Sequence, residues 1–269
     1  MMAVLSVALV VSAWVQSEPA SAQPGPVQRI TIGYSVQGRP LEAVVLGAAS
    51  ARRTVVVVGS VHGDEPGGLA VTDVLTEILV PSWLRVVVIP TLNPDGLAAG
   101  TRGNANGVDL NRNADHNWLP EGASEFTVGG YYPGPFPGSE PETVAITNYL
   151  AALRPHAVLW YHQPWGSVLC ADGRTTEAWC PAFAVAVGLP TDNAPRPGSL
   201  SGWSAGQGFG SAVVEFPEGS VDRGTALGHA AAILRLYTDP GRSGPRWVRN
   251  PVSVMVMGPA NRIGSVPSN

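Results

Sequence analysis

Lysine is absent from this sequence, and charged residues of every kind are scarce. Asp, Glu, Lys and Arg make up 13% of the 269 residues, against a usual share of about 25% in globular proteins. All 16 basic residues are therefore arginine, and the formal net charge is −4. Because proteins that bind nucleic acid normally present a basic face, this balance argues against a nucleic-acid partner.

The sequence also lacks an apolar run long enough to cross a bilayer. The run from Ala3 to Val15 falls short of the ~20 residues that a membrane-spanning helix needs. Small residues follow at Ala20 and Ala22, which is typical of a secretory signal peptide, although no basic residue precedes the run. We expect cleavage after Ala22, a secreted or cell-envelope protein and no membrane span in the mature chain. A retained N-terminal anchor is the alternative.

Cysteine is rare, since Cys170 and Cys180 are the only two. In an exported protein we expect them to form one disulfide that closes a short loop. Two free thiols are the alternative. A zinc site made by this pair is not expected, because nine intervening residues is not a zinc-knuckle spacing.

The length suits one large α/β domain, which we place at residues 27–239, with residues 1–22 as the signal peptide and 240–269 as a loosely ordered tail.

Apolar periodicity predicts strands at 27–32, 41–46, 54–58, 84–89, 157–161 and 211–214, and helices at 69–79, 141–153, 181–187 and 226–237. We expect Ser139 to cap the second of these helices. Residues 97–141, 163–180 and 190–210 are predicted to be loops.

Four of the predicted strands end at polar residues. In chain order the strand ends are followed by His62 and Glu65, by residues 93–95, by His162 and by Glu215. In open α/β sheets, ligands bind beyond the carboxyl ends of the strands. These side chains would therefore converge if the four strands are parallel neighbours.

The residue types at these strand ends suit one chemistry. Two histidines and a glutamate, His62, Glu65 and His162, form a catalytic zinc set that leaves a fourth position for water. Glu215 is the candidate general base, with Glu218 as the alternative. Two further features could complete a hydrolytic site: Arg102 as a cation for a developing oxyanion, and Asn111 with Arg112 as a bidentate grip for a substrate carboxylate.

A serine hydrolase is a competing hypothesis. Residues 202–206 read Gly-Trp-Ser-Ala-Gly, which matches the nucleophile-elbow pattern, and Asp222 and His229 follow in the required order. However, the pattern needs a core strand before it, and residues 195–198 are Pro-Arg-Pro-Gly. We otherwise expect His229 to be a surface or helix residue.

The motifs together resemble the zinc metallocarboxypeptidases. The similar segments are His-Gly-Asp-Glu at 62–65, Asn-Pro-Asp-Gly at 93–96, Arg102, Gly-Val-Asp-Leu-Asn-Arg-Asn at 107–113, Ser-Glu-Pro-Glu at 139–142, His162 and Val-Glu-Phe-Pro at 214–217. They occur in the family's order from about residue 54 to residue 218. Residues 100–104 and 161–164 look most like the murein peptide amidase branch, which hydrolyses the γ-D-glutamyl–diaminopimelate bond of peptidoglycan peptides.

The resemblance implies a mixed, mostly parallel eight-stranded sheet between helices. It also implies that His62, Glu65 and His162 bind Zn²⁺ and that Glu215 is the general base. By the same resemblance, Arg102 stabilises the oxyanion, and Asn111 and Arg112 bind the terminal carboxylate of a peptide substrate. Digestive members carry a mobile tyrosine that residues 163–214 lack; either Trp203 replaces it or nothing does.

We therefore expect a monomeric zinc carboxypeptidase or amidase that acts on peptides with a free C-terminal carboxylate, such as peptidoglycan stem peptides. Two alternatives keep the same metal site. One is a zinc-containing peptide-binding protein with little turnover, and the other is a deacylase of N-acyl amino acids.

Overall fold

The computed structural model describes residues 27–192 and 196–237. The predicted signal peptide and the predicted tail at 240–269 lie outside these residues. None of the helices within the described ranges is long and apolar enough to cross a membrane.

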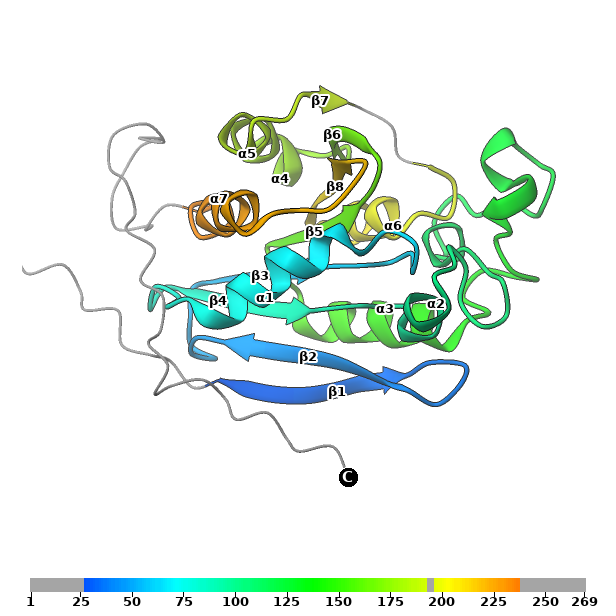
Figure 1. Cartoon of the computed structure of the whole chain (residues 1–269), viewed down its shortest axis with the longest axis horizontal. Coiled ribbons are helices and arrows are strands. Elements are labelled where there is room, and N and C mark those ends of the chain that lie inside the picture. The colour runs from blue at the N-terminus through cyan, green and yellow to red at the C-terminus, as the bar shows by residue number, and fades with distance from the viewer. Residues whose placement is uncertain (1–26, 193–195, 238–269) are drawn as a thin grey trace, which may run out of the picture.

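One mixed sheet of eight strands forms the centre of the fold (Figure 1), with strand order β1-β2-β4-β3-β5-β8-β6-β7. The strands are β1 (Gln28–Tyr34), β2 (Pro40–Leu46), β3 (Arg53–Val58), β4 (Leu84–Ile89), β5 (Ala157–His162), β6 (Trp165–Cys170), β7 (Thr191–Asp192) and β8 (Gly210–Pro217). The central strands β4, β3, β5 and β8 are parallel neighbours. The β1–β2, β2–β4 and β8–β6 pairs are antiparallel, so the predicted mixed, mostly parallel sheet is confirmed.

Both faces of the central strands are buried, which explains why their sequences read as continuous apolar runs. In β3, Val55 and Val57 belong to one hydrophobic cluster, while Val56 and Val58 belong to a second cluster on the other face. All four side chains are fully buried. A strand of this kind needs a layer of helices on each side.

Helices supply those two layers (Figure 1). The first cluster contains side chains of α1 (Leu69–Glu77), α5 (Cys180–Val187) and α7 (Arg223–Ile233). The second contains side chains of α3 (Pro141–Leu153) and α6 (Leu200–Gly206). The remaining short elements are α2 (Pro94–Ala99), α4 (Arg174–Glu177) and the 3₁₀ helices η1 (Pro66–Gly68), η2 (Leu110–Arg112), η3 (Glu125–Thr127) and η4 (Gly129–Tyr131).

Two of the predicted loops are wrong in part. Strand β6 and helix α4 lie within residues 163–180, and β7 and α6 lie within 190–210. The sequence of α6, Leu-Ser-Gly-Trp-Ser-Ala-Gly, has poor helix propensity. The helix forms because Ser199 Oγ accepts a hydrogen bond from the Gly202 N–H, 3.1 Å away, and because Leu200 is fully buried. Residues 97–141 form short 3₁₀ helices and irregular segments after the end of α2.

The prediction that Ser139 caps α3 is also wrong. The N-cap is Glu140, and its side chain makes no capping bond. Ser139 Oγ instead donates to Glu140 Oε1 (2.7 Å) and accepts from Asn113 Nδ2 (2.9 Å). The hydroxyl therefore fastens the start of α3 to the segment that follows η2.

His229 lies on α7 as expected, but it is buried. Its Nδ1 atom lies 3.1 Å from Tyr161 Oη, and its ring centroid lies 4.6 Å from that of Phe216. The two groups are within hydrogen-bond distance of each other. Burial lowers the pKa of His229 to about 4, so the folded protein holds the neutral imidazole.

The lowered pKa of His229 predicts a loss of stability in mild acid. The unfolded chain binds a proton near pH 6.5, whereas the folded chain binds it only near pH 4. The stabilising contribution is therefore complete above pH 6.5 and is lost as the pH falls towards 4. Between pH 7.5 and 5.0 we expect a loss of roughly 2 kcal/mol. Urea unfolding of the wild type and of His229→Gln at both pH values measures this loss of unfolding free energy. If the variant shows the same pH dependence as the wild type, His229 is not its source.

Candidate active site

The candidate site lies beyond the carboxyl ends of the parallel strands, as the sequence indicated. His62 and Glu65 follow β3, His162 is the last residue of β5, and Glu215 lies in β8. His162 and Glu215 are register partners in the β5–β8 ladder. The expectation that the strand ends would converge is confirmed for His62, Glu65, His162 and Glu215, whereas residues 93–95 do not line the pocket with them.

The turn after β3 is shaped by a close approach to α2. A Cβ atom on Gly63 would lie 1.9 Å from the carbonyl carbon of Gly96, so only glycine fits. The Gly63 N–H also donates to Thr101 O at 2.9 Å. The Asn-Pro-Asp-Gly segment thus fixes the path of the turn that carries His62 and Glu65.

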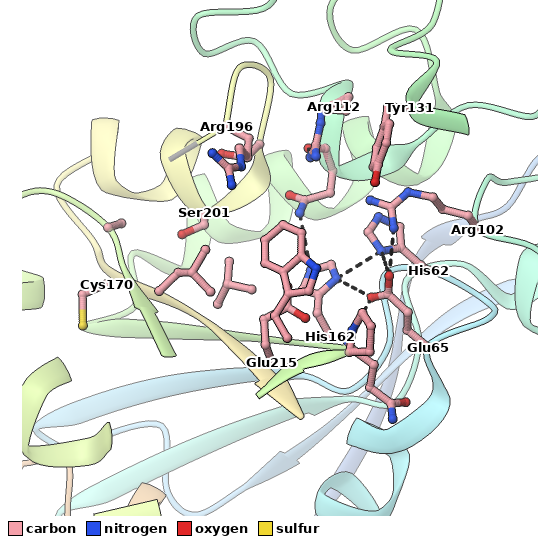
Figure 2. Close-up of a pocket in the computed structure, with 18 residues that line it drawn as sticks. His62, Glu65, Arg102, Arg112, Tyr131, His162, Cys170, Arg196, Ser201 and Glu215 are labelled. Atoms are coloured by element: carbon pink, nitrogen blue, oxygen red, sulfur yellow. Dashed lines mark hydrogen bonds and ion pairs between the residues drawn. The ribbon is translucent and has the colours of Figure 1, made fainter. Parts of the chain in front are cut away.

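The three predicted metal ligands come together in this turn and at the end of β5 (Figure 2). One ligand atom from each of His62, Glu65 and His162 lies within 4.8 Å of the others, and all three residues are buried. His62 Nδ1 lies 2.9 Å from Glu65 Oε1, and His162 Nδ1 lies 2.8 Å from Glu65 Oε2. The two Nδ1 atoms are 3.1 Å apart. Two imidazole nitrogens and a carboxylate directed at one point form a donor set that fits zinc.

Asp109 is a member of the site to which the sequence analysis gave no role. Its Oδ1 lies 2.9 Å from His62 Nε2, and its Oδ2 accepts from Arg102 Nε at 2.9 Å. Burial would raise the pKa of Asp109, but His62 and the neighbouring arginines Arg102 and Arg112 hold it well below its usual range. The carboxylate therefore accepts the Nε2 proton of His62 and leaves Nδ1 free for a metal. The sequence signal for this residue is its place in the segment 107–113, two residues before Asn111.

The substitution Asp109→Asn tests whether this carboxylate orients the metal ligand His62. Carboxylates that orient a histidine ligand typically contribute 10- to 100-fold to metal affinity or activity. We expect a loss of about that size in zinc affinity, measured by competition with a chromophoric chelator. Asp73→Asn is the matched control, because Asp73 is exposed on α1 and lies outside the pocket. Unchanged zinc affinity in the Asp109 variant would contradict its role.

Arg102 is held rigidly beside the metal ligands. Its Nη1 donates to Glu65 Oε1 at 2.8 Å and its Nε donates to Asp109. The guanidinium also lies 4.7 Å from the ring centroid of Tyr131. Burial would lower the pKa of Arg102, but Asp109 and Glu65 raise it. The remaining N–H donors of this fixed cation are available to the pocket that it lines.

Asn111 and Arg112 lie side by side in η2 and both line the pocket. The Oδ1 atom of Asn111 accepts from the Leu200 N–H at 3.0 Å. Arg112 donates from Nε to Phe126 O (2.9 Å) and from Nη1 to Asn111 O (2.7 Å). Its partners are neutral carbonyls, so its charge is not neutralised by a direct ion pair among the described residues.

Glu215 lines the same pocket and is buried. Its Oε2 atom has no hydrogen-bond partner in the described chain. Burial raises the pKa of Glu215, and Glu65 raises it further, whereas His162 lowers it. Glu218, the alternative base, is exposed and does not line the pocket.

Gln163 joins three parts of the site. Its backbone N–H donates to Glu65 Oε2 (3.2 Å), and its side-chain Oε1 accepts from the Gly67 N–H (2.9 Å). Its Nε2 donates to Pro217 O and Gly219 O, just after Glu215. A Cβ on Gly67 would lie 2.8 Å from Gln163 Oε1. The metal-ligand turn and the end of β8 are therefore tied to one side chain.

Trp203 is not brought to the pocket with the other predicted residues. It lies in α6, is 9% exposed and belongs to the second hydrophobic cluster. Its ring contacts Phe209, with centroids 6.4 Å apart. The aromatic side chains that do line the pocket are Tyr131 and Trp165, so a substrate-binding role for Trp203 has no support in this arrangement.

The serine hydrolase hypothesis is wrong. Ser204 is fully buried within α6. Asp222 caps α7 by accepting from the Gly224 and Thr225 N–H groups, and His229 contacts Tyr161. The three residues form no triad.

The predicted disulfide between Cys170 and Cys180 is present. It joins the end of β6 to the start of α5. Cys170 also lines the pocket, so the bridge supports one wall of the site.

Comparison with known proteins agrees with this geometry. The model of the zinc carboxypeptidase family matches residues 13–169. Murein peptide amidase A of Escherichia coli strain K12 is 34% identical over 203 residues, which cover 71% of this chain and 81% of that protein. Carboxypeptidase A6 of Mus musculus is 32% identical over 156 residues, covering 48% of this chain and 36% of that protein.

Solved structures are similar as well. The murein-tripeptide amidase of Escherichia coli O157 has a TM-score of 0.66 at 30% identity, covering 82% of this chain and 98% of that one. The carboxypeptidase A of Helicoverpa armigera has a TM-score of 0.65 at 20% identity, covering 78% of this chain and 67% of that one, which shows the shared fold alone. Since the family model spans more than half of the sequence and its metal-ligand pattern is assembled in space, this chain belongs to the zinc carboxypeptidase family and is a zinc-dependent hydrolase.

Proposed function

We propose that this enzyme hydrolyses the amide bond between the γ-carboxyl of D-glutamate and diaminopimelate in murein peptides. The relatives named as murein peptide amidase and murein-tripeptide amidase support this substrate. The observation that carries the proposal is the composition of one pocket, in which the metal ligands and Glu215 lie beside Arg112, a cation without a carboxylate partner among residues 27–192 and 196–237.

The metal ligands and four further polar side chains of the pocket have a part in this reaction. Arg112 and Asn111 bind the terminal carboxylate of the substrate, which places the scissile amide beside His62, Glu65 and His162. Zinc, when bound by these ligands, supplies a Lewis acid that polarises a carbonyl and lowers the pKa of water. Glu215 accepts a proton from the attacking water and returns it to the departing amine. Arg102 donates to the oxygen on which negative charge develops.

We also propose that the enzyme acts outside the cytoplasm. The disulfide between Cys170 and Cys180 supports this location, because disulfides persist in oxidising compartments. The predicted cleavage after Ala22 gives a direct test. Mass spectrometry of the exported protein should find Gln23 at the N-terminus, and a chain that retains residues 1–22 would contradict the proposal.

The substrate proposal is tested with L-Ala-γ-D-Glu-meso-diaminopimelate and zinc-loaded enzyme, with released diaminopimelate measured by mass spectrometry. We expect release of diaminopimelate. Cleavage of ordinary α-linked peptides alone would point to a general carboxypeptidase. Cleavage of N-acyl amino acids alone would point to a deacylase. Binding without cleavage of any of these would point to a peptide-binding protein.

A further inference from the structure

Three arginines line the pocket, and Arg196 is the one whose side chain is unsatisfied. Its Nε atom is buried without a hydrogen-bond partner in the part of the chain that the structure describes. Among the described residues, no carboxylate lies within ion-pair distance of it. By contrast, Arg102 is paired with Glu65 and Asp109. A partly buried guanidinium without an anion is costly unless a ligand supplies the anion.

Aromatic rings hold Arg196 in place without neutralising it. Its guanidinium carbon lies 3.9 Å from the ring centroid of Phe126 and 5.6 Å from that of Trp165. Burial lowers the pKa of Arg112, and the charges on Arg102 and Arg196 lower it further, while Asp109 opposes them. The pocket therefore holds neighbouring positive charges in excess of the carboxylates that line it.

Ser201 offers a hydrogen-bond donor to the same pocket. Trp160 Nε1, which can only donate, points to Ser211 Oγ at 3.2 Å. Ser211 Oγ in turn donates to Ser201 Oγ at 3.1 Å. This order leaves the hydroxyl proton of Ser201 without an acceptor among the described residues, although Ser201 is only 4% exposed. The proton is available to a ligand in the pocket that Ser201 lines.

We propose that Arg196 and Ser201 bind a second carboxylate, carried at the end of the side chain of the residue that the enzyme releases. This rests on the proposed function and assigns the part of the pocket that selects the substrate. In Figure 2, Arg196 and Ser201 lie on the side of the pocket away from His62 and Glu65, and Arg112 lies between. A residue whose α-carboxylate binds Arg112 would thus direct its side chain towards Arg196 and Ser201.

The walls between these groups suit an aliphatic side chain. Leu169, Ala171 and Val213 line the pocket, and their side chains carry no polar atom. The only carboxylates among the described lining residues are Glu65 and Glu215, and neither is paired with Arg196. The pocket therefore favours a side chain that ends in a carboxylate over one that ends in an amine alone.

Two matched tripeptides test this selectivity, namely L-Ala-γ-D-Glu-meso-diaminopimelate and L-Ala-γ-D-Glu-L-Lys. They differ only in the second carboxylate of the last residue. We expect the zinc-loaded wild type to prefer the first by at least about tenfold in kcat/KM. Arg196→Gln should lower kcat/KM for the diaminopimelate peptide about 10- to 100-fold, and Ser201→Ala about 2- to 10-fold. Neither variant should lower kcat/KM for the lysine peptide.

Arg174→Gln is the control, because Arg174 is exposed on α4 and lies outside the pocket. It should leave both rates unchanged. Equal rates of the wild type on both peptides, or an equal loss on both in Arg196→Gln, would overturn the assignment while leaving the proposed function intact.

If neither peptide is cleaved, the proposed function fails, and calorimetric binding of free meso-diaminopimelate and L-lysine decides the selectivity. Tighter binding of diaminopimelate that is lost in Arg196→Gln would support the assignment. Equal binding of both would overturn it.

Discussion

Replacing Glu215 by glutamine is expected to lower kcat by about 10²- to 10⁴-fold, because the amide cannot accept the proton of the attacking water. The substitution keeps the size of the side chain, and Glu215 is not one of the three clustered metal ligands. Zinc content should therefore stay at the wild-type level. Steady-state kinetics and elemental analysis of the same preparation measure both quantities.

Glu218→Gln is the matched control for that experiment. Glu218 lies three residues further along the chain, outside the pocket and exposed to solvent, and its replacement should leave kcat unchanged. Loss of turnover in the Glu218 variant, with retention in the Glu215 variant, would exchange the two assignments. Retained activity in both would remove the general base from the mechanism.

Replacing Arg102 by glutamine should lower kcat by about 10²- to 10³-fold, the usual effect of removing one donor to a developing oxyanion. KM should change little, because the terminal carboxylate of the substrate is bound by Arg112 and Asn111. Arg102→Lys should recover only part of the activity, since an ammonium cannot donate in a fork to Glu65 and Asp109 while also reaching the substrate.

The control for Arg102 must separate catalysis from stability. Arg39 is also paired with a buried carboxylate, that of Asp95, but it lies outside the pocket. Arg39→Gln should retain full kcat. Zinc content is measured in both variants, because Arg102 contacts the metal ligand Glu65. A kcat within fivefold of wild type in zinc-loaded Arg102→Gln would contradict the oxyanion role.

The metal ligands and Glu215 could be predicted from the strand pattern, because their position follows from the parallel strands. The apolar run of β3 requires burial on both faces. The polar residues that follow it therefore had to lie beyond the carboxyl end of the strand. The same reasoning placed His162 and Glu215 there. Pairing of these strands in one parallel block then brought their ends together.

The residues that could not be predicted are positioned by contacts distant in sequence. Strand β6 pairs with β8 in antiparallel register, and nothing in the residues 165–170 alone signals that partner. Asp109 acquires its role only because His62, 47 residues away, approaches it. Trp203 lies in a segment that was predicted to be a loop, but the burial of α6 places it in the core.

The bonds of Gln163 have a consequence for the energetics of catalysis. They fix the distance between the turn that carries Glu65 and the strand that carries Glu215 before any substrate arrives. The ordering of these groups takes place during folding, so little reorganisation is required at the moment of reaction. The site is in this sense preorganised, and binding energy from the substrate is available to orient the scissile bond.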